Sequence, residues 1–236
     1  MRTWLDLGRA GNFPSVAGNV LTALVLAAPA GPGWPPWTLL AWAVLAGCLV
    51  YAGGATLNDV ADAGFDARHR PERVIPRGII SRGTAAMVGG AEMAAGGAIL
   101  LWLGAAPSWF AGLVATILAY DWIHKRWVGS VVLMAGCRVL LALTIASLPG
   151  FRMTPALLGW LAGLFVYIVT LSLIARWEYR PGAPAARLGR AVGRLLAFIP
   201  LVDALVLAFV GAWLPALACG AAVPLGRWAQ RKAAAT

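Results

Sequence analysis

Long hydrophobic stretches fill most of this chain, and short polar or basic segments separate them. A membrane-spanning helix needs roughly 20 mostly apolar residues. On this pattern we predict spans at residues 13–30, 38–57, 84–103, 109–123, 130–148, 155–175, 195–212 and 214–228. The fourth and the last are short, and the last two could also form one interrupted segment. The pattern predicts an all-α, polytopic transmembrane helix bundle with about eight spans.

The composition supports this class and excludes a soluble protein. The 236 residues are 61% hydrophobic and 12% charged, whereas soluble domains carry about 25% charged residues. We expect residues 1–236 to form a single transmembrane domain. Residues 1–13 include Arg2, Asp6 and Arg9 without an uninterrupted apolar core, so we expect no removable signal peptide. Cys48 and Cys137 lie in apolar runs, as does the third cysteine, which favours buried structural thiols.

Basic residues mark one face of the predicted bundle. With eight spans, all of the 19 Lys and Arg residues fall on one side except Arg152, on the other side, and Arg138, inside a span. Because cytoplasmic loops carry the excess of Lys and Arg, both termini are expected in the cytoplasm. This indicates a multi-pass protein of a bacterial-type inner or plasma membrane. No separate basic domain exists that could bind nucleic acid.

An acidic motif follows the second predicted span, at Asn58, Asp59, Asp62 and Asp66. At about 100° per residue, these side chains share one face of a helix. Like charges on one helical face repel one another. A divalent cation is the simplest compensation, and carboxylate and amide oxygens with waters and substrate phosphates suit Mg²⁺. The motif therefore predicts a Mg²⁺ site on the cytoplasmic face.

A dense arginine cluster comes next, between Arg68 and Gly78. A metal site beside several Arg side chains is suited to a diphosphate, because the metal bridges phosphate oxygens and the guanidinium groups neutralise the remaining charge. Anchoring of the membrane topology is the alternative explanation for any single arginine.

These residues resemble the UbiA superfamily of intramembrane prenyltransferases. The resemblance rests on the Asn-Asp-x-x-Asp-x-x-x-Asp motif at 58–66, on Arg-x-x-Pro-x-Gly at 73–78, on Asn19, and on Tyr120 to Lys125, which is similar to a Tyr-x-x-x-Lys region with altered spacing. The residue sequence of the first motif is most similar to that of the EboC-like branch. The resemblance covers roughly residues 9–180 and implies a Mg²⁺-dependent enzyme that moves a prenyl group from a prenyl diphosphate to an acceptor.

One family feature is altered. Members usually carry a second Asp-rich motif after the sixth span, but residues 172–182 contain one carboxylate, Glu178. Arg176 and Arg180 could supply charge that a second Mg²⁺ would otherwise provide. Alternatively, catalysis has been lost, and the protein binds a prenylated or lipid-diphosphate molecule or helps to export it.

The resemblance and the charge pattern together give candidate roles. Metal ligands are expected at Asn58, Asp59, Asp62 and Asp66, and catalytic side chains at Asp59, Asp62 and Lys125. The diphosphate candidates are Arg68, Arg73, Lys125 and Arg176. Pocket candidates are Asn19, Tyr120, Arg138 and Glu178. The expected partners are a prenyl diphosphate, a lipophilic or aromatic acceptor and membrane lipid; the donor chain length, the acceptor and the oligomeric state are left open.

Four polar residues lie deep in different predicted spans: Asn19, Glu92, Arg138 and Asp203. Each is roughly 8–10 residues from the cytoplasmic end of its span, which is a shared depth of about 12–15 Å. Ionisable groups at such depth usually face the bundle interior and pair. We expect a polar floor in which Arg138 pairs with Glu92 or Asp203, serving either the site or only a clamp between helices.

Overall fold

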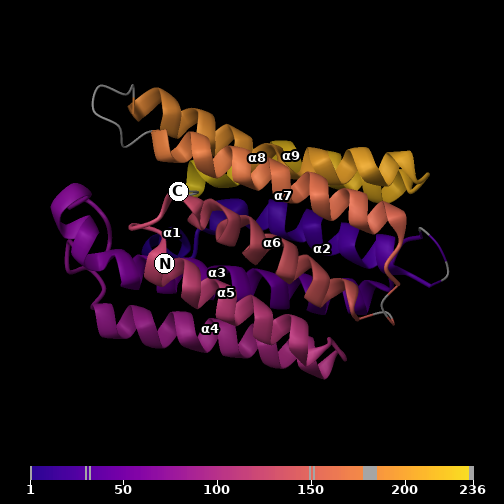
Figure 1. The fold of residues 1–236 in the computed structure, drawn as a ribbon, viewed down its shortest axis with the longest axis horizontal. Helices are drawn as coiled ribbons and strands as arrows, with labels where there is room; N and C mark the ends of the chain where they lie inside the picture. Colours follow the sequence, from indigo (N-terminus) through magenta and orange to yellow (C-terminus); the bar gives the residue numbers. More distant parts are fainter. Residues whose placement is uncertain are drawn as a thin grey trace.

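The computed structural model describes residues 2–29, 31, 33–148, 150, 152–177 and 185–233. Every regular element in these ranges is helical, which confirms the predicted all-α class. The elements are α1 (Arg2–Leu7), η1 (Ala10–Asn12), α2 (Phe13–Ala27), α3 (Trp37–His69), α4 (Arg82–Trp102), α5 (Pro107–Ile123), η2 (Val128–Ser130), α6 (Val131–Ala146), α7 (Pro155–Trp177), α8 (Ala185–Phe209) and α9 (Trp213–Lys232). The long helices lie side by side along the longest axis of the molecule (Figure 1).

A helix occupies each of the eight predicted positions, but not all of them have the character of a span. Among the described residues, six segments are long and apolar enough to cross a membrane: Ala10–Ala27, Trp37–His69, Arg82–Trp102, Val128–Ala146, Pro155–Trp177 and Leu188–Phe209. Helix α5 has 17 residues, which is at the lower limit of a span. Helix α9 has basic residues in its last turn. The protein is thus a polytopic membrane protein, and the count of eight spans stays a prediction.

Helix α3 continues well beyond the predicted end of its span at residue 57. It has 33 residues, which corresponds to a length of about 50 Å. Hydropathy marks only its apolar part, whereas the polar residues that follow extend the same helix. The helix stops at His69 because Pro71 disfavours helical geometry at Arg70, whose φ of −143° and ψ of 60° are non-helical. The whole acidic motif is therefore helical, as predicted.

Helix α2 forms the centre of the bundle. Twelve of its fifteen residues are buried, and it contacts α3, α6, α7, α8 and α9. In Figure 1, α7, α8 and α9 lie together on one side, α4 lies on the opposite side, and α2, α3 and α6 are between them. This arrangement places the C-terminal ends of α3, α5 and α7 around the start of α6.

Helices α3 and α4 pack with their backbones in contact. A Cβ atom at Gly53 would lie 2.6 Å from the carbonyl oxygen of Gly89, and one at Gly96 would lie 2.7 Å from that of Ala46. Only residues without a side chain permit so close an approach. Helix α4 therefore supports the outer side of the helix that carries the acidic motif.

Candidate active site

A cavity of about 520 Å³ opens between α3, α5, α6, α7 and α8. This volume lies within the usual range for small-molecule sites. Apolar side chains line the part that faces the middle of the helices, including Val50, Leu113, Ile117, Leu141 and Ile168. Charged side chains gather at the helix ends, apart from Arg138, which lies deeper within α6. The described lining includes six Lys or Arg residues (Arg9, Arg70, Arg73, Lys125, Arg138 and Arg176) and two carboxylates (Asp62 and Asp121).

Two carboxylates of the acidic motif, Asp59 and Asp66, are buried against arginines. Asp59 Oδ1 is 2.7 Å from Arg9 Nη2 and 3.1 Å from Arg73 Nη1. Asp66 Oδ2 is 2.9 Å from the same Arg73 nitrogen. In the structure these arginines compensate part of the negative charge, and the metal-ligand role of Asp59 and Asp66 stays a prediction. Neither Asp59 nor Asp66 is part of the described cavity lining.

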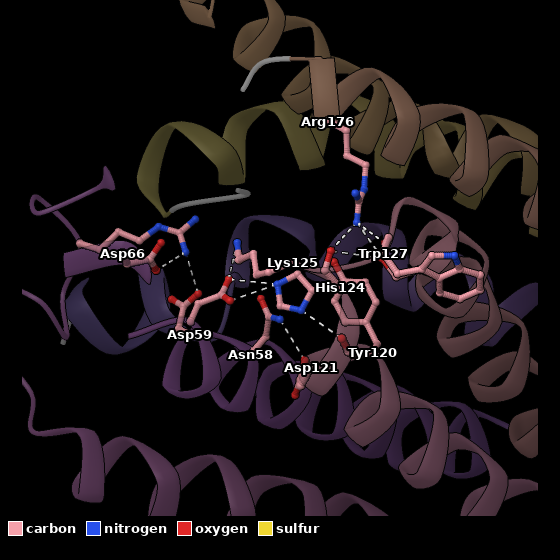
Figure 2. Close-up of polar contacts among 12 residues, drawn as sticks. Asn58, Asp59, Asp66, Tyr120, Asp121, His124, Lys125, Trp127 and Arg176 are labelled. Atoms are coloured by element: carbon pink, nitrogen blue, oxygen red, sulfur yellow. Dashed lines mark hydrogen bonds and ion pairs between the residues drawn. The ribbon is translucent and has the colours of Figure 1, made fainter. Parts of the chain in front are cut away.

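Asp62, in contrast, faces the cavity. Its carboxylate is 3.1 Å from His124 Nε2 and 2.9 Å from Lys125 Nζ. Lys125 also lies over the ring of Phe65, 4.3 Å from its centroid. Figure 2 shows His124 and Lys125, from the end of α5, beside the carboxylates of α3. We refer to Asp59, Asp62, Asp66 and their partners Arg9, Arg73, His124 and Lys125 as the ion-pair cluster.

Asn58 hydrogen-bonds to a carboxylate on α5. Its Nδ2 atom donates a 2.9 Å hydrogen bond to Asp121 Oδ1 on α5 (Figure 2). Both residues line the cavity. Sequence reasoning did not pair Asp121 with Asn58, because the two residues are 63 positions apart in the chain.

The donor set decides which kind of metal site fits here. Among the residues that the structure describes, no three His, Cys, Asp or Glu side chains form a group that could hold a metal ion. A closed protein cage is therefore not present in that part of the chain. Mg²⁺, however, is commonly held by one or two carboxylates, with waters and substrate phosphates completing its shell. Asp62, Asp121 and the amide oxygen of Asn58, all on the cavity wall, fit such an open site.

Arg176 lies at the C-terminal end of α7 and lines the cavity. Its Nη2 atom donates to the carbonyl oxygens of His124 and Trp127, the latter at 3.0 Å, and to Ser130 Oγ at 2.7 Å. These bonds connect α7 to the turn between α5 and α6 (Figure 2). Arg176 therefore positions the segment that carries His124 and Lys125.

The remaining sequence candidates have different environments. Tyr120 lines the cavity and stacks on His124, with ring centroids 4.6 Å apart. Arg68 is exposed on α3 and is outside the described lining; Arg9 and Arg70, which sequence reasoning missed as diphosphate candidates, line the cavity instead. Arg70 is the first residue after α3 and has a non-helical backbone. The sequence alone did not show where α3 ends, so it did not show that the Arg70 side chain lines the cavity. Glu178 lies outside the described residues.

Three of the four deep polar residues form a buried hydrogen-bond network. Arg138 Nη1 donates to Asn19 Oδ1 at 3.0 Å, and Asn19 Nδ2 donates to both carboxylate oxygens of Asp203, at 3.0 and 2.9 Å. Trp160 Nε1 also donates to Asp203, at 2.8 Å, and Arg138 Nη2 donates to Ser15 at 3.1 Å. We call Arg138, Asn19 and Asp203 the polar relay.

The predicted ion pair of Arg138 with Glu92 or Asp203 is wrong, because Arg138 hydrogen-bonds to Asn19 and Ser15 instead. Asn19 stands between Arg138 and Asp203, because its amide group can accept from one and donate to the other. Glu92 lies on α4, which packs against α3, and its Oε2 atom is buried without a hydrogen-bond partner among the described residues. Shared depth could not distinguish Glu92 from the other three, since depth does not show which way a side chain points around its helix.

The fold and the cavity define an integral membrane protein with a ligand site that is cationic at the helix ends and apolar deeper in the bundle. The chain belongs to the UbiA prenyltransferase family, which matches residues 19–233. It is therefore a membrane prenyltransferase by family.

Two similar proteins were found. The 4-hydroxybenzoate octaprenyltransferase of Paracidovorax citrulli (strain AAC00-1) is 29% identical over 209 residues, which is 84% of this chain and 68% of that protein. A solved structure of digeranylgeranylglyceryl phosphate synthase has a TM-score of 0.54 at 12% identity and covers 98% of this chain and 94% of that one. The structural likeness supports the fold.

Proposed function

We propose that this protein transfers a prenyl group from a prenyl diphosphate to a small acceptor, with Mg²⁺, at the cytoplasmic face of the membrane. The observation that carries the proposal is the division of one cavity into a cationic end and an apolar wall. A prenyl diphosphate has the same division, because its hydrocarbon chain is apolar and its diphosphate is strongly anionic. The proposal includes the EboC-like branch, for which the motif at 58–66 is the support, and a single domain over residues 1–236.

The cationic end suits the departing diphosphate. In the reaction, the bond between the first prenyl carbon and the bridging oxygen breaks, and its electron pair leaves with the diphosphate. The carbon then bonds to the acceptor, which releases a proton. Fixed cations stabilise the charge that develops on the leaving oxygens. Lys125, Arg73 and Arg176, with Arg70, are the residues that we assign to this task, since all of them line the cavity.

Asp62 and Asn58, with Asp121, would hold the metal, and Asp62 lies next to Lys125 at the cationic end of the cavity. Bound Mg²⁺ neutralises phosphate oxygens and so makes the diphosphate a better leaving group. Within the ion-pair cluster, we assign Asp59 and Asp66 mainly to holding Arg73 and Arg9 in place, because both carboxylates are buried behind the cavity wall.

The apolar wall suits the prenyl chain and a lipophilic acceptor. Apolar surroundings exclude water, which would otherwise capture an allylic cation. Tyr120 presents an aromatic ring to the cavity and could stabilise such a cation. The Paracidovorax relative is named for 4-hydroxybenzoate, so an aromatic acid is the first acceptor that we propose to test.

The test uses purified protein with radiolabelled geranylgeranyl or farnesyl diphosphate, with and without Mg²⁺. Wild type is compared with Asp62→Asn and with the matched control Glu72→Gln, an exposed carboxyl group of the same arginine-rich segment that lies outside the cavity lining. We expect Mg²⁺-dependent binding and product formation in wild type and in Glu72→Gln, and loss of product in Asp62→Asn.

Other outcomes have defined meanings. Binding that needs Asp62 without transfer to any aromatic, quinone-precursor or lipid acceptor would favour a carrier of lipid diphosphates. Equal activity in wild type and Asp62→Asn would contradict the assigned metal site. Absence of binding to any prenyl diphosphate would contradict the proposed donor.

A further inference from the structure

One wall of the cavity contains hydrogen-bond donors that the diphosphate end does not need. Arg138 and Tyr51 line this wall, together with Asn12. Tyr51 precedes Asn58 by seven residues on α3, which places it roughly 10 Å deeper along that helix. The Arg138 guanidinium lies over the Tyr51 ring, 5.0 Å from its centroid. These two side chains therefore form a separate polar site within the otherwise apolar part of the cavity.

The hydrogen bonds of Arg138 leave part of its guanidinium group available. Arg138 is 8% exposed, and it makes hydrogen bonds to Asn19 and Ser15 through one N–H on each terminal nitrogen. A guanidinium group has five N–H donors. No carboxylate in the described part of the chain lies within ion-pair distance of it. A buried cation with unused donors and no direct counter-ion is costly, and an anionic ligand would offset that cost.

Tyr51 adds a second donor to the same site. Its hydroxyl oxygen accepts a 2.9 Å hydrogen bond from Asn12 Nδ2. Because the oxygen is used as an acceptor, the hydroxyl proton is free to point elsewhere, and no described residue accepts it. A guanidinium edge beside a hydroxyl donor favours a planar group with two oxygen acceptors, which describes a carboxylate.

The polar relay fixes the orientation of Arg138. Asp203 is fully buried and accepts both donors of its neighbours, Asn19 and Trp160. The Asn19 amide nitrogen is thus turned to Asp203, and its oxygen is turned to Arg138. A Cβ atom at Gly18 would lie 2.8 Å from Asp203 Oδ2, so the glycine leaves room for this carboxylate beside α2. Asp203 offsets the charge of Arg138 through the amide group of Asn19. The side of the Arg138 guanidinium that faces the cavity is left for a ligand.

We propose that Arg138 and Tyr51 bind the carboxylate of the acceptor, and that Asn19 and Asp203 are positioning residues for Arg138. This inference rests on the proposed prenyl transfer, and it specifies the acceptor class as a small carboxylic acid. The diphosphate is bound at the other end of the cavity, where Lys125, Arg73 and Arg176 lie. The acceptor then lies with its acid group deep and its reacting atom toward the donor.

The experiment compares an acid with its uncharged amide. Binding of 4-hydroxybenzoate and 4-hydroxybenzamide is measured on purified protein with Mg²⁺ and an unreactive thio-analogue of the prenyl diphosphate. We expect wild type to bind the acid at least about 10-fold more tightly than the amide, since a lost charge-assisted pair costs about this much. Arg138→Gln should lose the preference, and Tyr51→Phe should reduce it. Glu92→Gln, a carboxyl change on α4 outside the cavity lining, should retain it.

Binding of the prenyl diphosphate analogue separates the possible failures. If wild type does not bind the analogue, the proposed function fails. If wild type binds the analogue but shows no preference for the acid, or no binding of it, the acceptor inference is overturned. Retention of the preference in folded Arg138→Gln would overturn it as well.

Two further variants keep the test informative if Arg138→Gln does not fold. Arg138→Lys retains a charge in the relay but cannot form two parallel hydrogen bonds, so it should bind the acid about 10-fold less tightly while donor binding is unchanged. Asp203→Asn should raise the KM for the acid and leave the donor affinity unchanged. A purely structural clamp would instead lower the stability of these variants without altering the ratio of acid to amide binding.

Discussion

The ion-pair cluster and the polar relay both hold carboxylates inside the bundle, but they do so in different ways. In the cluster, Asp59, Asp62 and Asp66 contact cationic side chains directly. In the relay, Asp203 accepts hydrogen bonds from the neutral groups of Asn19 and Trp160. The cluster lies beside the open cavity, whereas Asp203 is fully buried.

The difference shows which carboxylates can exchange partners. Lys125 is about one-third exposed, so its contact with Asp62 can give way to a phosphate oxygen at little cost, as is usual for accessible ion pairs. Asn19 and Trp160 have no comparable alternative, because a buried donor that loses its acceptor costs free energy. The cluster is therefore suited to substrate binding and the relay to fixed positioning.

The largest expected effect is on turnover in Asp62→Ala. Loss of the carboxylate that faces the cavity should lower the transfer rate about 100-fold to 1,000-fold, as for the removal of one electrostatic stabiliser of a transition state. The free energy of unfolding should fall by less than for a change at fully buried Asp203, because Lys125 is about one-third exposed and Asp62 borders the cavity. Activity assays and thermal unfolding in the same detergent check both parts. If the free energy of unfolding fell by as much as the free energy of activation rose, the ion-pair cluster would be a structural region like the polar relay.

The next effect in size is on stability in Asp203→Ala. Leaving the buried donors of Asn19 and Trp160 without an acceptor should cost on the order of 2–4 kcal/mol. Chemical unfolding in detergent measures the change, with Glu92→Ala as a control in another membrane helix. Unchanged stability in Asp203→Ala would mean that water or another group replaces the carboxylate and that the relay is not rigid.

The sequence predicted the helices and the depth of polar residues within them better than the partners toward which their side chains point. The acidic motif was correctly placed on a helix, because its residues have helical spacing and directly follow an apolar span. Its pairing with Arg9 and Arg73 was not predicted, because Arg9 is 50 residues from Asp59 and no periodic pattern links them. Asp121 was missed as a partner of Asn58 for the same reason. For the relay, the depths of Asn19, Arg138 and Asp203 were informative, and the amide bridge between them depended on packing.

A smaller effect distinguishes the two arginines that the sequence treated alike. Arg73 contacts Asp59 and Asp66 and lines the cavity, whereas Arg68 is exposed and outside its lining. Arg73→Gln should raise the Kd for a prenyl diphosphate about 10-fold, equivalent to one charge-assisted hydrogen bond. Arg68→Gln should leave it within about 2-fold, as for most surface changes. Equal weakening by both variants would indicate a diffuse electrostatic attraction in place of a defined contact.

Salt should produce the smallest effect and should act on one region only. Between about 0.1 M and 1 M ionic strength the screening length falls from about 10 Å to 3 Å, so the exposed charges around the cavity mouth lose part of their attraction for a diphosphate. The contacts of Asp203 are fully buried, and buried groups are screened much less. Over this range, donor affinity should therefore fall several-fold while the ratio of acid to amide binding, which depends on buried Arg138, stays nearly constant. Titration of both ligands at the two salt concentrations measures this, with an uncharged detergent held constant. A parallel fall in both quantities would mean that Arg138 is reached by solvent in the working enzyme, and the cluster and the relay would then differ in partners but not in accessibility.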